Sequence, residues 1–455
     1  MAAIDPTQNG SDVAALLRTE PDKYTSLGDL LKYAKPDNRD LLIKTYGDQG
    51  ITGFLQLTGA TRSSGTQDEV QWWEEGRLHK TVAFNTVDSD SVNCAAFTAD
   101  TAPARVNDVL MFENGERVVV TAVNAGSNEL AIVRMDGGTV SAIAAAGTAI
   151  IIGNIYAQGT GQPSEFYQTD VTKRINPYLI TKETYHVNGS QATNIGWINI
   201  GNGDYRWYVK GEMDTRKRFM NQREMMMLFS ERVADTATAG ADNITIGGST
   251  KVTGSEGYFA AIEDRGITTT GTFGDGAGFA DIDEIIFELD KQGAPSEYAM
   301  YVDTKTSLAI DDMLATGIAT QTTAGLPGQF GAFQNSADMA VQLGFKSFSR
   351  GSYTFHKHGW KLLSDPTLLG AFTDKPYKGA MVPMTQVVDA KTGTKAPALE
   401  MNYKETNGYS RELEHWVEGG GVLGFKTNDE DLAKFHYRSE CNLVTRAANM
   451  HVALT

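Results

Sequence analysis

The chain has 455 residues, more than an ordinary domain of roughly 100–200 residues, so we expect two or more lobes or a shell-type fold with insertions. Its 40 Lys and Arg against 56 Asp and Glu give a net charge of −16, which argues against a repressor, histone-like protein or polymerase that grips nucleic acid phosphates over its whole surface. The 41% of apolar residues, with 47 Gly and 12 Pro, are typical of a folded, loop-rich protein.

The cysteines and the longest apolar stretch exclude further classes. Cys94 and Cys441 belong to no C-x-x-C pair, which argues against a cysteine-based zinc site and a disulfide framework and favours a reducing compartment. The N-terminus lacks the basic and apolar regions of a secretory signal. Ser141–Ala157 is the most apolar stretch, but Gly147 and Gly153 interrupt it and it is too short to span a membrane.

Residues 1–79 combine short helical patterns with polar spacers. Val13, Leu16 and Leu17 recur at helical spacing, and Pro21 and Pro36 interrupt such patterns. Segments this short bury too little apolar surface to be stable alone. We therefore expect an arm that wraps over something else.

From about residue 80 to 163 the pattern changes to β-strands. Asn114 and Gly115 between two apolar runs predict a hairpin with a two-residue type I′ turn, in which both central residues have positive φ. Strands at Leu130–Arg134 and Ala149–Ile152 follow, and the turns are too close for helical crossovers. The segment predicts a small antiparallel module of about four strands.

Further strands are expected over 165–210, followed by one long helix from about Glu212 to Ala234. Asp214 or Thr215 is expected to cap its start. The apolar residues expected on one face of this helix are Phe219, Met226, Phe229 and Val233.

An α/β lobe is expected next. Ile282, Ile285, Ile286 and Leu289 define an amphipathic helix, with Asp281 as N-cap and with Gly293 and Pro295 as stop signals. The other elements expected in and beyond this lobe are a buried strand at Tyr298–Val302, a helix around Ser307–Leu314, a strand at Ser352–Leu363, a half-buried strand in which Leu399, Met401 and Tyr403 alternate with Glu400, Asn402 and Lys404, and a closing strand at Phe435–Thr445.

The sequence indicates no catalytic, cofactor-binding or metal-binding residue. The stretch Gly274–Gly278 is interpreted as a flexible loop, and Gly421–Thr427 departs from a phosphate-binding loop because Phe425 separates glycine from lysine. His356 and His358 share one face of a strand, as half a metal site would, but no acidic or cysteine ligand is near in sequence, so a rim or intersubunit contact is favoured.

Two further clusters are interpreted structurally. Trp72, Trp73, Glu74 and Glu75 resemble a sugar platform with carboxylates, but adjacent strand residues point to opposite sides, which predicts one buried and one exposed tryptophan. Met225–Met227 is expected to fill gaps in a core. The sequence therefore favours a protein whose function is its own packing.

The segment Ala102–Gly161 resembles the β insertion in the extended loop of major capsid proteins of tailed double-stranded DNA bacteriophages. The residues that fall on the family pattern are Asp108, Val109, Leu110, Glu116, Val120, Thr121, Ala122, Val123, Leu130, Val133, Arg134, Gly138, Thr139 and Gly147. Outside this segment the order of elements agrees with the family, but individual motifs are loose.

The resemblance implies an α+β, HK97-like capsid fold. It implies an N-terminal arm (1–79), an extended loop with the β insertion (80–163), a peripheral domain with a long spine helix (164–248), an axial α/β domain (249–398) and C-terminal strands returning to the peripheral and axial domains (399–455).

The resemblance also implies a structural, non-enzymatic role. Copies of the chain would form hexamers and pentamers of an icosahedral head, made in the bacterial cytoplasm, around double-stranded DNA with weak lumenal contact. The implied partners are a portal and decoration or auxiliary proteins. Because Met1 stands almost directly at the arm, we expect a separate scaffolding protein. No motif places the residues of the covalent cross-links that some members form. The alternatives are an encapsulin-like compartment shell, a minor capsid or decoration protein, and an unrecognised hydrolase.

Overall fold

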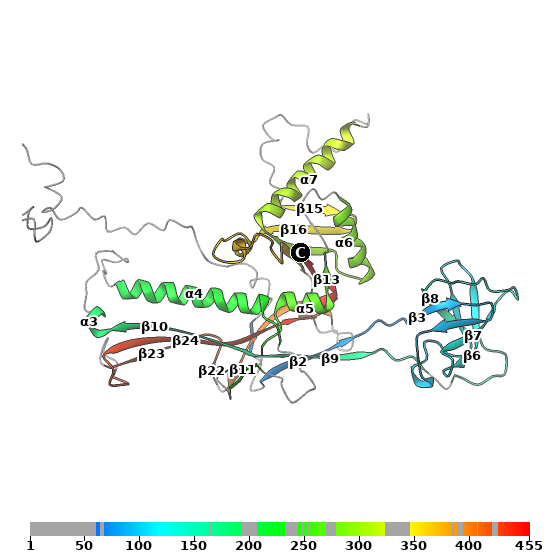
Figure 1. The fold of residues 1–455 in the computed structure, drawn as a ribbon, viewed down its shortest axis with the longest axis horizontal. Helices are drawn as coiled ribbons and strands as arrows, with labels where there is room; N and C mark the ends of the chain where they lie inside the picture. Colours follow the sequence, from blue (N-terminus) through cyan, green and yellow to red (C-terminus); the bar gives the residue numbers. More distant parts are fainter. Residues whose placement is uncertain are drawn as a thin grey trace, which may run out of the picture. The chain divides into compact units, whose positions relative to one another are not determined.

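The structure is a computed structural model. It describes residues 61–63, 68–163, 166–192, 207–232, 244–246, 250–252, 254–269, 279–323, 346–384, 386–388, 395–406, 408–420 and 426–455. Most of the expected N-terminal arm lies outside the described residues. The described part is a strand-rich α+β protein (Figure 1). The chain divides into two compact units, the first made of Met1–Thr52, Ile180–Met225 and Arg411–Ser439, and the second of Gly53–Leu179, Met226–Ser410 and Glu440–Thr455.

The first unit is an antiparallel sheet covered by a long helix. Its strands are β10 (Leu179–Asn188), β24 (Leu432–Thr445) and β23 (Glu414–Gly419), with β24 in the middle, and its helices are α3 (Gly189–Ala192) and α4 (Trp207–Phe229). The buried ring of Phe219 on α4 lies 5.9 Å from the ring of Tyr437 on β24. Aromatic packing therefore fixes α4 to one face of this sheet.

The long helix differs from its prediction at both ends. It begins at Trp207 and ends at Phe229, so Asp214 and Thr215 lie inside it and cap nothing. Thr215 instead donates a hydrogen bond from its hydroxyl to the carbonyl of Gly211, 2.8 Å away. Phe219 is buried as expected, whereas Met226 is 41% exposed. Val233 lies outside the described residues.

The second unit contains a six-stranded mixed sheet. Its strands, in spatial order, are β13 (Ile267–Thr268), β25 (Val452–Leu454), β17 (Gly379–Pro383), β14 (Glu297–Val302), β16 (Tyr353–Gly359) and β15 (Ser347–Arg350). Helices α6 (Phe279–Lys291) and α7 (Thr304–Thr323) pack on it through a buried cluster that includes Ile285, Ile310 and Phe355. Helix α5 (Tyr258–Arg265) contributes Phe259, whose ring stacks on that of Tyr377 at 4.0 Å.

The ends of α6 and α7 show how local sequence sets these helices. Gly293 has a φ of +64°. The Gly293 amide donates a hydrogen bond to the carbonyl of Asp290, and the Ala294 amide donates one to the carbonyl of Leu289. This is a Schellman motif, and it confirms the prediction that Gly293 ends the helix. Asp281 lies within the first turn of α6, so the N-cap prediction is wrong. Asp303 caps α7, because its carboxylate accepts a 2.8 Å hydrogen bond from the Thr306 amide.

Strands β20 (Leu399–Tyr403) and β1 (Thr61–Ser63) complete the five-stranded sheet that contains β10, β23 and β24, and the other remaining strands lie in smaller sheets. β20 (Leu399–Tyr403) pairs with β1 (Thr61–Ser63) and with the end of β24, and three hairpins pair β11 (Ile244–Ile246) with β12 (Thr250–Val252), β18 (Gln386–Val388) with β19 (Lys395–Pro397), and β21 (Glu405–Thr406) with β22 (Tyr409–Ser410).

Two strand predictions need correction. β20 is buried on both faces, because Glu400 is 3% exposed and is paired with Arg446 at 2.7 Å. The half-buried prediction for this strand is therefore wrong. The expected strand Ser352–Leu363 ends at Gly359, and Lys361–Leu363 form a 3₁₀ turn. The strands at Tyr298–Val302 and Phe435–Thr445 are confirmed by β14 and β24.

Candidate functional site: an anchored ribbon that carries a closed β-barrel

Residues 81–154 form a closed six-stranded barrel in place of the expected module of about four strands. The strands, in order around the barrel, are β3 (Thr81–Val87), β4 (Ser91–Cys94), β7 (Glu129–Arg134), β6 (Arg117–Asn124), β5 (Asp108–Met111) and β8 (Gly147–Asn154). The two missed strands, β3 and β4, alternate inward side chains such as Val82 and Val92 with outward polar ones. Closure removes every unpaired edge from this module.

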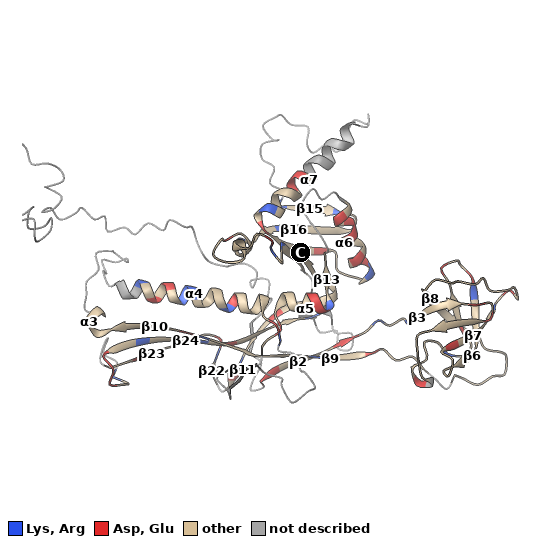
Figure 2. Ribbon diagram, viewed as in Figure 1, with Lys and Arg blue, Asp and Glu red and all other residues tan. Residues whose placement is uncertain are grey.

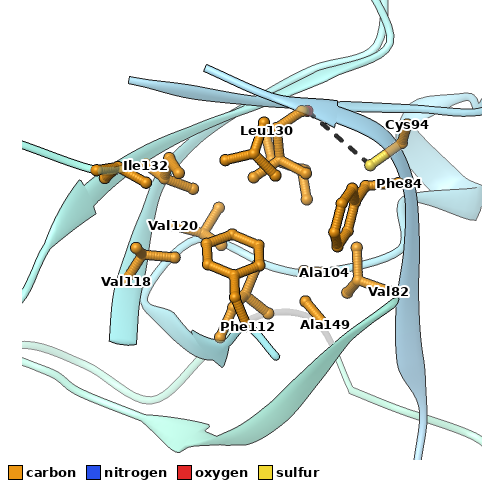
Figure 3. Close-up of a cluster of buried hydrophobic side chains, with 14 residues drawn as sticks. Val82, Phe84, Cys94, Ala104, Phe112, Val118, Val120, Leu130, Ile132 and Ala149 are labelled. Carbon is orange, nitrogen blue, oxygen red and sulfur yellow. Dashed lines mark hydrogen bonds between the residues drawn. The ribbon is translucent and has the colours of Figure 1, made fainter. Parts of the chain in front are cut away.

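Side chains fill the barrel interior (Figure 3). The rings of Phe84 and Phe112 meet edge to face at 5.6 Å, and a side chain at Gly147 would place its Cβ 2.7 Å from the Phe84 ring. Cys94 is buried in the same core, and burial raises the pKa of its thiol. The barrel is a packed core with no need of a ligand to fill it.

The hairpin between β5 and β6 exists, but its turn is not type I′. Phe112 pairs with Glu116, the Gly115 amide bonds the Phe112 carbonyl at 2.9 Å, and Gly115 has a φ of +82° while Asn114 has none in the positive region. This pattern is typical of a three-residue loop with glycine at the left-handed position. The Asn114 side chain accepts a hydrogen bond from the Glu116 amide at 3.0 Å instead.

A charged cluster joins the start of β6 to the end of β7 and to the chain that follows β7. The Glu116 carboxylate accepts hydrogen bonds from the Ser141 amide at 3.0 Å and the Ser141 hydroxyl at 2.6 Å, and it lies 3.1 Å from the Arg134 guanidinium. Hydrogen bonding from Ser141 and the charge of Arg134 lower the pKa of Glu116. Glu116 and Arg134 both belong to the capsid-like sequence pattern.

A two-stranded ribbon carries the barrel. β2 (Glu69–Glu75) runs antiparallel to β9 (Val171–Pro177) and pairs with no other described strand. Trp72 is 8% exposed and Trp73 is 66% exposed, which confirms the prediction of one buried and one exposed tryptophan. An isolated ribbon of this kind is marginally stable in water, so its contacts decide its conformation.

Asn176 anchors the ribbon at the end distant from the barrel. Its side chain is fully buried. The side-chain amide nitrogen donates hydrogen bonds to the carbonyls of Glu256 at 3.0 Å and Leu443 at 2.7 Å. The side-chain amide oxygen accepts hydrogen bonds from the Ser255 hydroxyl at 3.0 Å and the backbone amide of Glu256 at 2.9 Å. The Asn176 carbonyl accepts a further bond from Asn442 at 2.9 Å. One side chain therefore joins the ribbon to β24 and to the segment before α5.

Two more contacts hold the other end of the ribbon. The Glu74 carboxylate accepts hydrogen bonds from the indole of Trp72 at 3.1 Å and the amide of Ala447 at 3.3 Å. Beyond the strand, the Arg77 guanidinium donates to the carbonyl of Lys291 at 2.7 Å and to the Gln292 side chain at 3.2 Å, at the end of α6.

A clasp, made of Arg105, Asp108 and Tyr167, joins the barrel to the chain that leaves it. The Tyr167 hydroxyl donates to the buried carboxylate of Asp108, and the Arg105 guanidinium lies 4.2 Å from the centre of the Tyr167 ring and 3.3 Å from Asp108. Burial and the Asp108 charge raise the pKa of Tyr167. None of these four anchoring contacts was predicted from the sequence, because a single Asn, Glu, Arg or Tyr carries no periodic signal.

The histidines of β16 and the methionine run of α4 form no common site in the described residues. His356 and His358 lie on β16, where His358 stacks on Tyr301 at 5.1 Å, and no three metal-ligating side chains gather anywhere in the described ranges. Of the methionine run on α4, Met227 is buried and Met226 is exposed, so the core interpretation is wrong for Met226. Gly274–Gly278 and most of Gly421–Thr427 lie outside the described residues.

Within the part of the chain that the structure describes, no helix is long and apolar enough to cross a membrane. Cys94 and Cys441 are both buried free thiols.

The chain matches no protein family and no curated protein. Among solved structures it is similar to the capsid of the cyanophage P-SCSP1u, with 10% identity, 94% of each chain covered and a TM-score of 0.41. It is also similar to the mature capsid of bacteriophage PhiM1 (9% identity, 91% of each chain, TM-score 0.38) and to an encapsulin from Synechococcus elongatus (11% identity, 63% of this chain and 77% of that one, TM-score 0.32). Two of these three structures are phage capsids.

Proposed function

We propose that the chain is the major capsid protein of a tailed double-stranded DNA bacteriophage, with the HK97-like fold. Copies of it form hexamers and pentamers of an icosahedral shell that encloses the genome. In this proposal the arm, extended loop, peripheral domain, axial domain and C-terminal strands have the boundaries expected from the sequence. The protein acts as a structural component of the virion head and catalyses no reaction.

The observation that carries the proposal is where the family-like residues of segment 102–161 lie. They form the barrel itself: Asp108 starts β5 and belongs to the clasp, Glu116 and Arg134 form an ion pair between the start of β6 and the end of β7, and Gly147 makes room for the Phe84 ring. Each of these residues has a packing or hydrogen-bonding role. The pattern therefore specifies a fold element, and this supports a shared architecture for the extended loop.

The ribbon supports a role in assembly. Trp73 is 66% exposed and Val171 is 49% exposed on a two-stranded element that projects apolar side chains into solvent. Exposed aromatic side chains on a narrow ribbon are typical of surfaces that another protein covers. A neighbouring copy in a shell would cover them.

The partners follow from the same proposal. A separate scaffolding protein guides assembly, a portal occupies one vertex, and decoration or auxiliary proteins bind outside. The net charge of −16 favours only weak lumenal contact with packaged DNA, because a strongly basic lining would oppose its movement. The chain is made in the cytoplasm of the host bacterium.

The test is assembly of the full chain, alone and together with candidate scaffolding proteins. Size-exclusion chromatography with light scattering, followed by negative-stain microscopy of the largest species, should reveal hexameric rings or closed spherical particles. A compact monomer under every condition would contradict the proposal. Particles that hold protein cargo and no nuclease-resistant double-stranded DNA would favour an encapsulin-like compartment instead.

A further inference from the structure

Two strands late in the sequence occupy internal places in the large sheets. β24 and β25 lie within residues 432–455, and we call these residues the closing segment. β24 lies between β10 and β23, and β25 lies between β13 and β17. Each described strand that pairs with the closing segment precedes it in the sequence. An internal strand of each sheet is therefore synthesised after all of its described neighbours.

In the first unit the closing segment supplies most of the buried contacts of α4. The buried cluster there consists of Phe219 on α4 and of Ala433, Phe435 and Tyr437 on β24. Of the strands that the structure describes, β10 and β23 pair with β24 alone. Without the closing segment these two strands are isolated, and isolated strands are unstable in water.

In the second unit the same segment completes the six-stranded sheet and the anchor of the ribbon. β13 pairs with β25 alone among the described strands, and Val452 and Leu454 of β25 are fully buried in the core of the sheet. The anchor residue Asn176 bonds the carbonyl of Leu443 at 2.7 Å and the side chain of Asn442 at 2.9 Å. The ribbon and β13 therefore reach their final structure only with the closing segment in place.

The charges of the closing segment are mostly positive, although the chain has a net charge of −16. The segment holds one acidic and three basic side chains, which are Glu440, Lys434, Arg438 and Arg446 (Figure 2). Arg446 lies 2.7 Å from Glu400, which is 3% exposed, and Arg438 is ion-paired with Glu414, which is 10% exposed. A buried carboxylate that lacks its partner is strongly destabilising. Glu400 on β20 and Glu414 on β23 therefore disfavour burial of these strands before the closing segment arrives.

The barrel is complete without the closing segment. Its six strands lie within residues 81–154 and pair with one another, and its buried core is drawn from residues 82–149. By contrast, β10 ends at Asn188 and β24 begins at Leu432. At roughly 5–20 residues per second, synthesis reaches β24 about 10–50 s after β10. Contacts between residues close in sequence also form faster than distant ones.

We propose that the closing segment sets the order of folding. The barrel folds first, during synthesis, and the closing segment then completes both large sheets in one later step. The finished surfaces of these sheets do not exist before this step, so an unfinished chain cannot associate through them. This consequence for assembly rests on the proposed shell function, whereas the order of folding does not.

Refolding of the full chain from urea tests the order. Pulsed hydrogen exchange, measured by mass spectrometry of peptide fragments, should show protection of residues 81–154 first. β10, β13 and β23 should become protected later, at the same rate as β24 and β25. Protection of β10 or β23 before β24, or of the barrel only together with the sheets, would overturn the proposal.

A matched pair of variants of the full chain tests the role of β24 without refolding. Lys434 pairs with Glu418 of β23. Lys434→Pro removes a backbone N–H from an internal strand, whereas Lys434→Thr removes the same side chain and keeps the N–H. We expect Lys434→Pro to raise hydrogen exchange in β10 and β23 at least about tenfold and to leave exchange in the barrel within about twofold of the original. Lys434→Thr should leave exchange in both within about twofold.

Each result for Lys434→Pro decides one part of the proposal. Unchanged exchange in β10 and β23 would overturn the role of the closing segment. Loss of protection in the barrel would overturn its independent folding.

Production of mixtures in one cell tests the consequence for assembly. Particles formed by the original chain should contain at least about tenfold less Lys434→Pro than the cell supplies, whereas Lys434→Thr should enter in proportion to its supply. Equal entry of Lys434→Pro would overturn this consequence. Failure of the original chain to form particles would contradict the shell function, and the hydrogen-exchange results would still decide the order of folding.

Discussion

Asn176 links segments that are far apart in sequence through one fully buried amide group. Its oxygen accepts two hydrogen bonds and its nitrogen donates two, so the side chain has its full complement of partners. Buried polar groups are costly only when they lack partners. The arrangement therefore stabilises the end of the ribbon distant from the barrel only while Asn176 keeps all four of its hydrogen-bond partners.

Replacing Asn176 with alanine should leave the carbonyl of Leu443 and the hydroxyl of Ser255 without their partners in a buried site. We expect destabilisation of about 2–4 kcal/mol, seen as a lower midpoint in urea unfolding followed by fluorescence. Asn188→Ala, at the exposed end of β10, is the matched control and should change the midpoint little. An unchanged midpoint for Asn176→Ala would show that the anchor contributes no net stability.

Glu224 on α4 is a second residue with an unusual environment. Burial raises the pKa of its carboxyl to about 7, and one of its oxygens is buried without a hydrogen bond in the described structure. Because the folded pKa lies above the ordinary value of 4.5, the folded chain holds the proton more tightly. This contribution to stability is complete below pH 4.5 and is lost as the pH rises to about 7.

Glu224→Gln should therefore act in a pH-dependent way. Near pH 5 the variant should unfold like the original chain, whereas at pH 8 it should be more stable by about 1–2 kcal/mol. Thermal unfolding at the two pH values measures this difference. The control is Glu284→Gln, on the exposed face of α6. It should change the unfolding temperature by the same amount at both pH values. Equal effects of Glu224→Gln at both pH values would refute the raised pKa.

Among the elements, the clasp connects the barrel to the chain that returns from it to the ribbon. Asp108 is 1% exposed and accepts hydrogen bonds from the Arg105 amide and from Tyr167, which belongs to the chain leaving the barrel. The clasp thus ties the start of β5 to the return segment. Losing one donor leaves the carboxylate buried with fewer partners.

Tyr167→Phe should loosen the return segment and leave the barrel core intact. We expect limited proteolysis between residues 155 and 170 to become several-fold faster, as local opening becomes less costly. Tyr156→Phe, in the same segment but outside the clasp, is the control. Unchanged cleavage of Tyr167→Phe would mean that the hydroxyl bond to Asp108 does not restrain this segment.

Periodic elements were predictable from the sequence, and elements defined by distant contacts were not. The apolar spacing of α6 and its glycine stop agree with the structure because both signals are local. The burial of Glu400 was missed because its ion pair with Arg446, far away in the sequence, decides it. The same limit applies to the candidate site: its strands follow a local pattern, but barrel closure and the Asn176 anchor depend on long-range pairing.

At the scale of the whole molecule, every copy carries a net charge of −16 and must approach others like it. At low ionic strength this repulsion between copies extends over tens of ångströms. Ion pairs between surfaces in contact act over only a few ångströms. We therefore expect long-range repulsion to dominate the salt dependence of assembly, even where the surfaces that meet have opposite sign.

Raising NaCl from about 50 mM to about 300 mM should lower the protein concentration at which particles first form, because the Debye length shortens. Light scattering across a concentration series at each salt level measures this threshold. A second variant, Ala145→Lys at an exposed position of the barrel, reduces the net negative charge and should lower the threshold most at low salt. A threshold that rises with salt would mean that ion pairs between surfaces outweigh the repulsion.

The chain enters the barrel through β3 and leaves it after β8, and these two strands are hydrogen-bonded neighbours. Both connections therefore leave from the same seam of a module that keeps its own core and has no open edge. The surface residues of such a module can change in evolution without disturbing the ribbon that holds it. The whole module can also be replaced by a foreign domain whose two ends lie equally close together.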